Sequence, residues 1–327
     1  MAPRRDRDLT FDPTGDVLLI LTENKSNRPN QQLEAKVSSR HLALASEVFR
    51  VMFDGGFKER IGPGQPIRRV PLPDDDAKAM MILLGILHGL SGRVPKTIRL
   101  RTFVKIGILV DKYQLQEAVE VYVDRWFQPL WDAAEYETCA GLAKWIFLTS
   151  AFNLDSEFKM MTWYAIYRGD QSIYDHGLPL PAAICTEIDR QRTTALEGLL
   201  DYLRDLIKRY TARGRPQCSE LCDALVLGDL IKKLTRVGLY PVPEVIDASW
   251  TLETLFWKVK HLKFLSLCQS AAALPDQDPS GSELEWVPEA RDCNLTCAIR
   301  AKVNELTAET HGLELPFETT RRRRSDR

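Results

Sequence analysis

Residues 37–60 have the sequence VSSRHLALASEVFRVMFDGGFKER, and this stretch decides the fold class. Its pattern is that of a strand end followed by two short helices. Ser46 is a favourable N-cap for the second helix, and Gly55 and Gly56 end it because glycine accepts the left-handed conformation found at helix ends. Three large apolar side chains share one face of this helix: Phe49, Met52 and Phe53. Burying each one contributes about 1.5–3 kcal/mol, so the rest of the chain or a second subunit must cover them.

The composition is typical of a soluble globular protein. The chain has 327 residues, of which 44% are apolar and 27% charged, and its length suggests roughly two domains. A net charge of -1 provides no overall attraction to nucleic acid or to an anionic membrane, and no apolar run approaches the ~20 residues of a membrane span. The first residues, MAPRRDRD, lack the apolar segment of a secretory signal. With seven cysteines, this favours reduced thiols in the cytoplasm or the nucleus.

Strand signals lie on both sides of the opening stretch. The apolar run at 17–21 predicts a well-covered strand, and the alternation of Leu33, Ala35 and Val37 predicts a second one. Glycine and proline within 62–66 break the chain before a short third strand expected over 67–70.

An acidic triplet, Asp74 to Asp76, precedes the next helix, whose apolar face runs from Ala77 to His88. Three carboxylates in a row also occur in metal sites. At a helix start, however, the pattern favours capping and compensation of the helix dipole.

Helical periodicity dominates the rest of the chain. Beyond residue 131 strand signals nearly vanish, and amphipathic stripes are expected over 142–149, 158–166, 196–210, 221–237, 252–267 and 298–306. The sequence therefore predicts an α+β fold, with a small, mostly antiparallel sheet flanked by helices and then a mainly α-helical region. The predicted organisation is a flexible lead (1–11), the α+β domain (12–131), the helical region (132–311, with a loop near 270–290) and a basic disordered tail (312–327).

The first domain resembles a BTB/POZ domain, which is a protein–protein interaction module. The matching positions are Asp16, Val17, Leu42, Ala43, Ala45, Ser46, Phe49, Met52 and Phe53. Later motifs resemble the fungal branch of that family, in which a helical extension also follows the domain. These motifs are Ile86-Leu87-His88-Gly89, Val94-Pro95, Leu109-Val110-Asp111-Lys112-Tyr113 and Trp126.

The resemblance implies self-association into a homodimer. Contributors to such pairing would be the strand aspartate and apolar residues of the first strand and first helix: Asp16, Leu18, Leu42 and Leu44. In the family a basic residue joins the aspartate in a charged pocket at the dimer interface. Here Ser38-Ser39 stands where many members carry histidine and then lysine or arginine, which argues against a corepressor-type groove.

A second partner is suggested by Phe57-Lys58-Glu59, which resembles the hook by which many BTB domains grip a cullin-type ubiquitin-ligase scaffold. Phe57 would insert into a pocket and Glu59 would accept hydrogen bonds, and Phe53 is a further candidate partner-binding residue. The alternative is that Phe57 folds back on the core beside a solvated Glu59.

Protein–protein interaction without catalysis is the function that these patterns favour. The sequence contains no phosphate-binding loop, no dinucleotide fingerprint, no H-E-x-x-H and no nucleophile elbow. A substrate adaptor of a cullin ligase is one alternative. A nuclear transcriptional regulator is another, supported by the basic run Arg321 to Arg324. A solvated disordered tail is the favoured explanation of that run, and no specific nucleic-acid partner is expected.

Two cysteine pairs leave a metal site open. Cys218 and Cys222 are four residues apart, as are Cys293 and Cys297. Pairs at this spacing share a helix face, so together they would supply four thiolates to zinc. The other interpretation is that these cysteines act as small apolar residues of core helices, with no cofactor.

Overall fold

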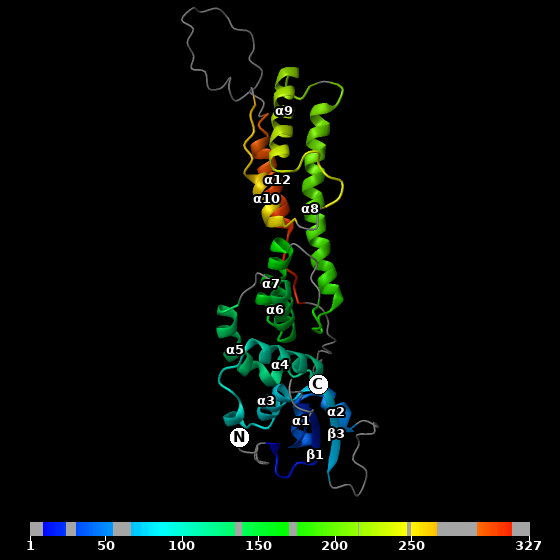
Figure 1. Ribbon diagram of the computed structural model, residues 1–327, viewed down its shortest axis with the longest axis vertical. Coiled ribbons are helices and arrows are strands. Elements are labelled where there is room, and N and C mark those ends of the chain that lie inside the picture. Colours follow the sequence, from blue (N-terminus) through cyan, green and yellow to red (C-terminus); the bar gives the residue numbers. More distant parts are fainter. Residues whose placement is uncertain are drawn as a thin grey trace, which may run out of the picture. The chain divides into compact units, whose positions relative to one another are not determined.

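The computed structural model describes residues 9–23, 31–54, 67–134, 139–169, 175–214, 216–246, 250–266 and 293–315 (Figure 1). These residues fall into two compact units. Unit 1 holds the described residues up to Phe158, together with 175–180 and 314–315, and unit 2 holds 159–169 and the described part of 181–313. The predicted domain limit at residue 131 stays a prediction.

Unit 1 contains a mixed sheet of three strands, in the order β2-β1-β3 among the described residues. The strands are β1 (Val17–Glu23), β2 (Gln31–Val37) and β3 (Arg68–Asp76). β1 is central, with Leu19 opposite Ala35 of the antiparallel β2 and opposite Val70 of the parallel β3. Alternate residues of each strand are buried, as a sheet covered on one face requires.

Two features of the sheet differ from the sequence-based expectation. One of its two strand pairs is parallel, because the connection from β1 to β3 passes through two helices and so permits parallel pairing. The third strand also continues beyond 67–70 to Asp76, through Pro71 and Pro73. Both prolines fit because β3 is an edge strand, where one side of the backbone makes no ladder hydrogen bond.

Helices cover the buried face of this sheet. α3 (Ala77–Leu87) packs against all three strands and is buried along most of its length, and α4 and α5 pack against α3 (Figure 1). The remaining helical elements of unit 1 are α1 (Ser39–Ala45), α2 (Glu47–Asp54), the 3-10 turn η2 (Ser91–Arg93), α4 (Leu100–Tyr113), α5 (Gln116–Asp132) and α6 (Cys139–Ala151). α7 (Asp155–Arg168) contains the residue at which the two units divide. The α+β class is therefore confirmed.

Two predicted helix caps are confirmed. The hydroxyl of Ser46 accepts a hydrogen bond from the backbone N–H of Phe49 at 3.1 Å, at the start of α2. The carboxylate of Asp76 accepts one from the backbone N–H of Ala79 at 3.0 Å, at the start of α3. This hydrogen bond makes Asp76 the N-cap of α3, and the same carboxylate also forms an ion pair with Lys105.

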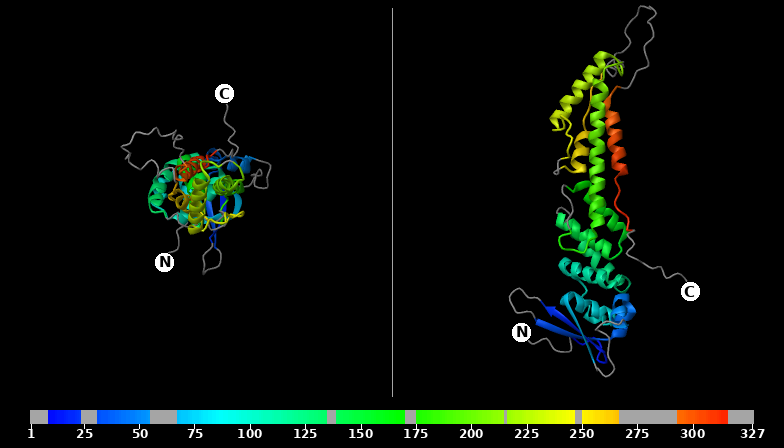
Figure 2. Two further views of the ribbon diagram at one scale, coloured as in Figure 1. Left: turned by 90° about the horizontal axis from the view of Figure 1, so that it is seen from above. Right: turned by 90° about the vertical axis from the view of Figure 1, so that its right-hand side faces the viewer.

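Unit 2 is a helical bundle built around α8 (Ala182–Thr211). α8 packs against α9 (Glu220–Arg236), α10 (Leu252–Lys260) and α12 (Leu295–Glu309), and the right-hand view of Figure 2 shows α9 and α12 on opposite sides of it. Leucines of the predicted stripe fill the core between these helices, among them Leu199, Leu200 and Leu203. None of the helices that the structure describes is long and apolar enough to cross a membrane.

The ends of two helices in unit 2 differ from expectation. α10 ends at Lys260, before the expected limit at 267. α8 begins at Ala182, well before 196, because Arg192 occupies a core position that interrupts the apolar pattern. Its guanidinium donates a hydrogen bond to the backbone oxygen of Ala165 at 2.7 Å and pairs with the carboxylate of Asp189 at 3.4 Å, which offsets the cost of burying the charge.

Candidate interaction surface and cysteine cluster

The strand aspartate of the predicted pairing surface is bound within its own chain. The backbone N–H and the hydroxyl of Ser39 donate hydrogen bonds to the carboxylate of Asp16, at 2.8 and 2.6 Å. Burial alone would raise the pKa of Asp16, but the hydrogen bonds from Ser39, together with the charge of Arg40, outweigh it and lower that pKa. These two hydrogen bonds tie the start of α1 to the residue that precedes β1.

His88 holds the N-terminal end of α1 against α3. The backbone N–H of Ser38 donates to Nε2 of His88 at 3.1 Å, so the ring proton lies on Nδ1, which contacts the backbone oxygen of Leu84 at 2.9 Å. Burial first, and then the nearby His41, lowers the pKa of His88. Because a protonated ring cannot accept the hydrogen bond from Ser38, this contact requires neutral His88.

The leucines of α1 point in opposite directions. Leu42 is fully buried in the core of unit 1, whereas Leu44 is 89% exposed. Exposed Arg40 and His41 lie one turn before Leu44 on the same helix. The apolar surface that α1 offers to a partner is therefore Leu44, with a basic side chain beside it.

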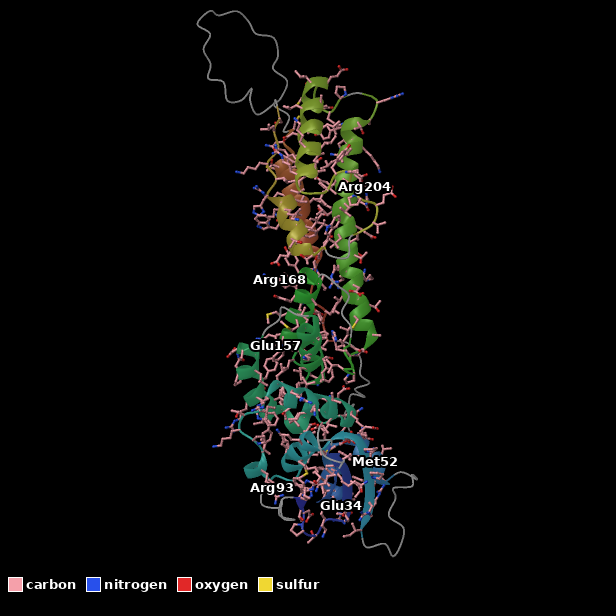
Figure 3. The ribbon with its side chains drawn as sticks, in the orientation of Figure 1. Glu34, Met52, Arg93, Glu157, Arg168 and Arg204 are labelled. Atoms are coloured by element: carbon pink, nitrogen blue, oxygen red, sulfur yellow. The ribbon has the colours of Figure 1, made fainter. Side chains whose placement is uncertain are left out.

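Leu18 lies on the other face of the sheet from the helices and is half-buried. Glu34 of β2, labelled in Figure 3, forms an ion pair with Arg69 of β3 across the central strand. Arg69 stands opposite Leu18 and Glu34 opposite Ile20, so the ion pair spans β1 between these two apolar residues. This arrangement limits the apolar surface of the open sheet face.

The predicted cullin hook is only partly within the described residues. Phe57 and Glu59 lie outside them, so scaffold binding through this hook stays a prediction. Phe53 belongs to the core, where its ring lies under the guanidinium of Arg68 at 5.0 Å. Arg68 also donates a hydrogen bond to the backbone oxygen of Met52 at 2.9 Å, which ties the last turn of α2 to β3.

A buried polar network that the sequence did not predict joins α2, β3 and α4. The hydroxyl of Tyr113 donates to the carboxylate of Asp75, and the ammonium of Lys112 pairs with the same carboxylate at 2.6 Å. The hydroxyl of Ser46 donates to the backbone oxygen of Tyr113 at 2.6 Å. Burial, and then the hydrogen bond and charge of Asp75, raise the pKa of Tyr113 well above its ordinary value. The sequence contains the residues of this network in the acidic triplet and in the Lys112-Tyr113 pair, but no local sequence pattern predicts that they contact one another.

Three of the four predicted metal-binding cysteines come together in unit 2. The sulfur atoms of Cys218, Cys222 and Cys293 all lie within 4.8 Å of one another. Cys222 and Cys293 are buried, and Cys218 is half-buried. Cys297 is exposed and does not belong to this group.

Helix starts position these three thiols. Ser219 is the N-cap of α9 and accepts from the backbone N–H of Cys222 at 3.2 Å. Asp223 accepts from the backbone N–H of Cys218 at 3.3 Å. Cys293 directly precedes Asn294, the N-cap of α12. The pKa of nearby Tyr210 is raised, first by burial and then by the charge of Cys293.

Two comparisons with known proteins gave no match. No protein-family model matches the chain, and no curated protein matches it.

Proposed function

We propose that this chain is a non-catalytic protein–protein interaction protein that self-associates through a BTB/POZ-type domain in residues 12–131. The observation that carries the proposal is the exposure of Leu44, at 89%, on a helix whose other leucine is fully buried. The succession of β1, β2, α1, α2, β3 and α3 supports it, because Val17, Leu42 and Phe49, which carry part of the resemblance, lie on β1, α1 and α2.

α1 is well suited to present a binding residue because both of its ends are fixed. At its start, Ser39 is bonded to Asp16 and Ser38 to His88. Directly after its end, Ser46 is bonded to the backbone oxygen of Tyr113. A side chain on an element held this way loses little conformational freedom on binding, so more of its burial energy contributes to affinity.

A second copy of the chain is the proposed partner of this surface. In a two-fold symmetric dimer both subunits use the same patch, so each interface buries Leu44 twice. Each buried leucine contributes about 1.5–3 kcal/mol, and 1.4 kcal/mol corresponds to a tenfold change in affinity. Replacing Leu44 by a charged residue is therefore expected to raise the dissociation constant of the dimer at least about 100-fold.

The experiment is light scattering of the full chain over a range of concentrations, for wild type, Leu44→Glu and Val121→Glu. Val121 is a matched control because it is 78% exposed and lies on α5 of the same unit. Wild type and Val121→Glu are expected to have the mass of a dimer, and Leu44→Glu that of a monomer, all with the same circular dichroism spectrum. A monomeric wild type, or a Leu44→Glu variant that dimerises as wild type does, would refute the proposal.

A further inference from the structure

Three thiols from two distant parts of the chain converge at one place in unit 2. Cys218 lies just before α9, Cys222 in its first turn, and Cys293 just before α12. Their sulfur atoms all lie within 4.8 Å of one another. Only the packing of the bundle brings Cys293 to the other two, so the cluster is a product of the fold.

The spacing of the sulfur atoms is close to that of a metal–thiolate site. Zinc–sulfur bonds are about 2.3 Å long, and in a tetrahedral site this places the sulfur atoms about 3.8 Å apart. The thiols are therefore within a small side-chain adjustment of the positions that a bound ion requires.

The surroundings also favour negatively charged ligands. Both α9 and α12 begin beside the cluster, and the partial positive charge of a helix N-terminus stabilises an anion such as a thiolate. Burial of Cys222 and Cys293 makes uncompensated thiolates costly, and a divalent cation supplies the compensating charge. Thiolate ligands select soft or borderline ions, among them Zn²⁺.

We propose that Cys218, Cys222 and Cys293 form a zinc-binding site that clips the start of α9 to the start of α12. The three thiolates occupy three positions of a tetrahedron. Water takes the fourth position and can reach the cluster because Cys218 is half-buried. Exposed Cys297 is not a ligand, which distinguishes this site from the four-cysteine arrangement suggested by sequence spacing.

Such an ion would stabilise the bundle. It connects the start of α9 to the start of α12, two segments that lie on either side of a long stretch of chain. Because the three thiols are brought together only by folding, zinc binds the folded chain in preference to the unfolded one and raises its melting temperature.

The test is metal binding by the full chain, purified with reductant and stripped of metal. Zn²⁺ is titrated in competition with a chromophoric chelator, and Co²⁺ is added in a separate experiment as a spectroscopic probe. One equivalent of Zn²⁺ is expected to bind and to raise the melting temperature. Co²⁺ is expected to give the visible bands of a tetrahedral ion together with thiolate-to-metal charge transfer.

Cysteine-to-serine variants assign the ligands. Cys218→Ser, Cys222→Ser and Cys293→Ser should each weaken Zn²⁺ binding by more than the 10–100-fold that loss of an outer-shell partner costs. Cys185→Ser and Cys297→Ser are the matched controls and should bind as wild type does. Cys218→Ser is the most informative variant, because its partial exposure makes a folding defect least expected.

Three results would overturn the proposal. The first is that the reduced wild type takes up no stoichiometric Zn²⁺ or Co²⁺. The second is that Cys297→Ser loses binding as completely as Cys222→Ser. The third is that two of the three thiols are joined in a disulfide in protein kept under reductant, which would make the cluster a redox pair.

Discussion

Replacing Tyr113 by phenylalanine tests the network that joins α2, β3 and α4. The hydroxyl of Tyr113 donates a hydrogen bond to the buried carboxylate of Asp75, while its ring stacks on Phe49 with the ring centroids 4.3 Å apart. Tyr113→Phe removes only the hydroxyl. The ring packing stays, and the carboxylate of Asp75 keeps its ion pair with Lys112.

The expected loss follows from the kind of bond removed. A hydrogen bond to a charged group contributes about 1.5–3 kcal/mol, so the free energy of unfolding of unit 1 should fall by about that amount. Tyr113→Ala also removes the buried ring and should cost about 3–5 kcal/mol. Lys112→Met should cost less than about 1 kcal/mol, because the Lys112 side chain is 47% exposed and solvent screens its charge.

The Tyr113 hydroxyl also has a pH signature. Its pKa is raised in the folded state, so folding favours the neutral phenol. The resulting contribution to the free energy of unfolding is fully present below the ordinary tyrosine pKa of about 10 and is lost as the pH rises above it. The difference in stability between wild type and Tyr113→Phe should therefore narrow in alkaline solution.

Two assays check this set of variants. Urea unfolding gives the change in free energy, and amide hydrogen exchange of peptides from α2, β3 and α4 shows whether the loss is local to the network. The reasoning is refuted if Tyr113→Phe unfolds at the same urea concentration as wild type. It is also refuted if Lys112→Met is the more damaging change.

Three further changes have expected outcomes. His88 has a lowered pKa, so its contribution to the stability of the fold is present above about pH 6.5 and is lost as the pH falls. The melting temperature of wild type should therefore drop between about pH 7 and pH 5, and that of His88→Gln should drop less. Asp76→Ala should cost about 0.5–2 kcal/mol in urea unfolding because it removes the cap of α3, whereas exposed Asp74→Ala should change little. Gly15→Ala should cost at least about 1–3 kcal/mol, because its Cβ would lie 2.4 Å from a backbone oxygen of β2, and Gly92→Ala, whose Cβ meets open space, should be neutral by the same measurement.

Local signals in the sequence predicted much of the fold. The Ser46 and Asp76 caps, the first two strands and the stripe around Leu199 and Leu200 all depend on residues within a few positions of one another, and each is found where it was expected. Features that depend on distant partners were not predicted. The extension of β3 through Pro71 requires knowledge that this strand lies at the edge of the sheet.

The candidate sites show the same limit. The four-residue spacing of Cys293 and Cys297 suggested one helix face, but Cys293 precedes the helix that contains Cys297, and only Cys293 joins the cluster. Leu42 and Leu44 were both predicted to contribute to pairing. The prediction for Leu42 is wrong because its side chain is buried in the core, whereas that of Leu44 is exposed on the opposite side of α1. The contacts of Asp75 with Tyr113 and Lys112 could not be predicted from the sequence, because only the packing of α4 beside β3 creates them.

The position of β3 in the sheet has a consequence for the order in which unit 1 forms. β1 and β2 are neighbours in sequence and can pair as soon as both exist, whereas β3 reaches β1 only after α1 and α2 have been made. Closing that longer loop costs more chain entropy and makes the parallel pairing a late event. Until Arg68–Leu72 arrives, the outer edge of β1 exposes a row of unsatisfied backbone groups, the usual template for pairing with another chain. A nascent or truncated chain that stops before residue 68 is therefore the form of this protein most prone to aggregate.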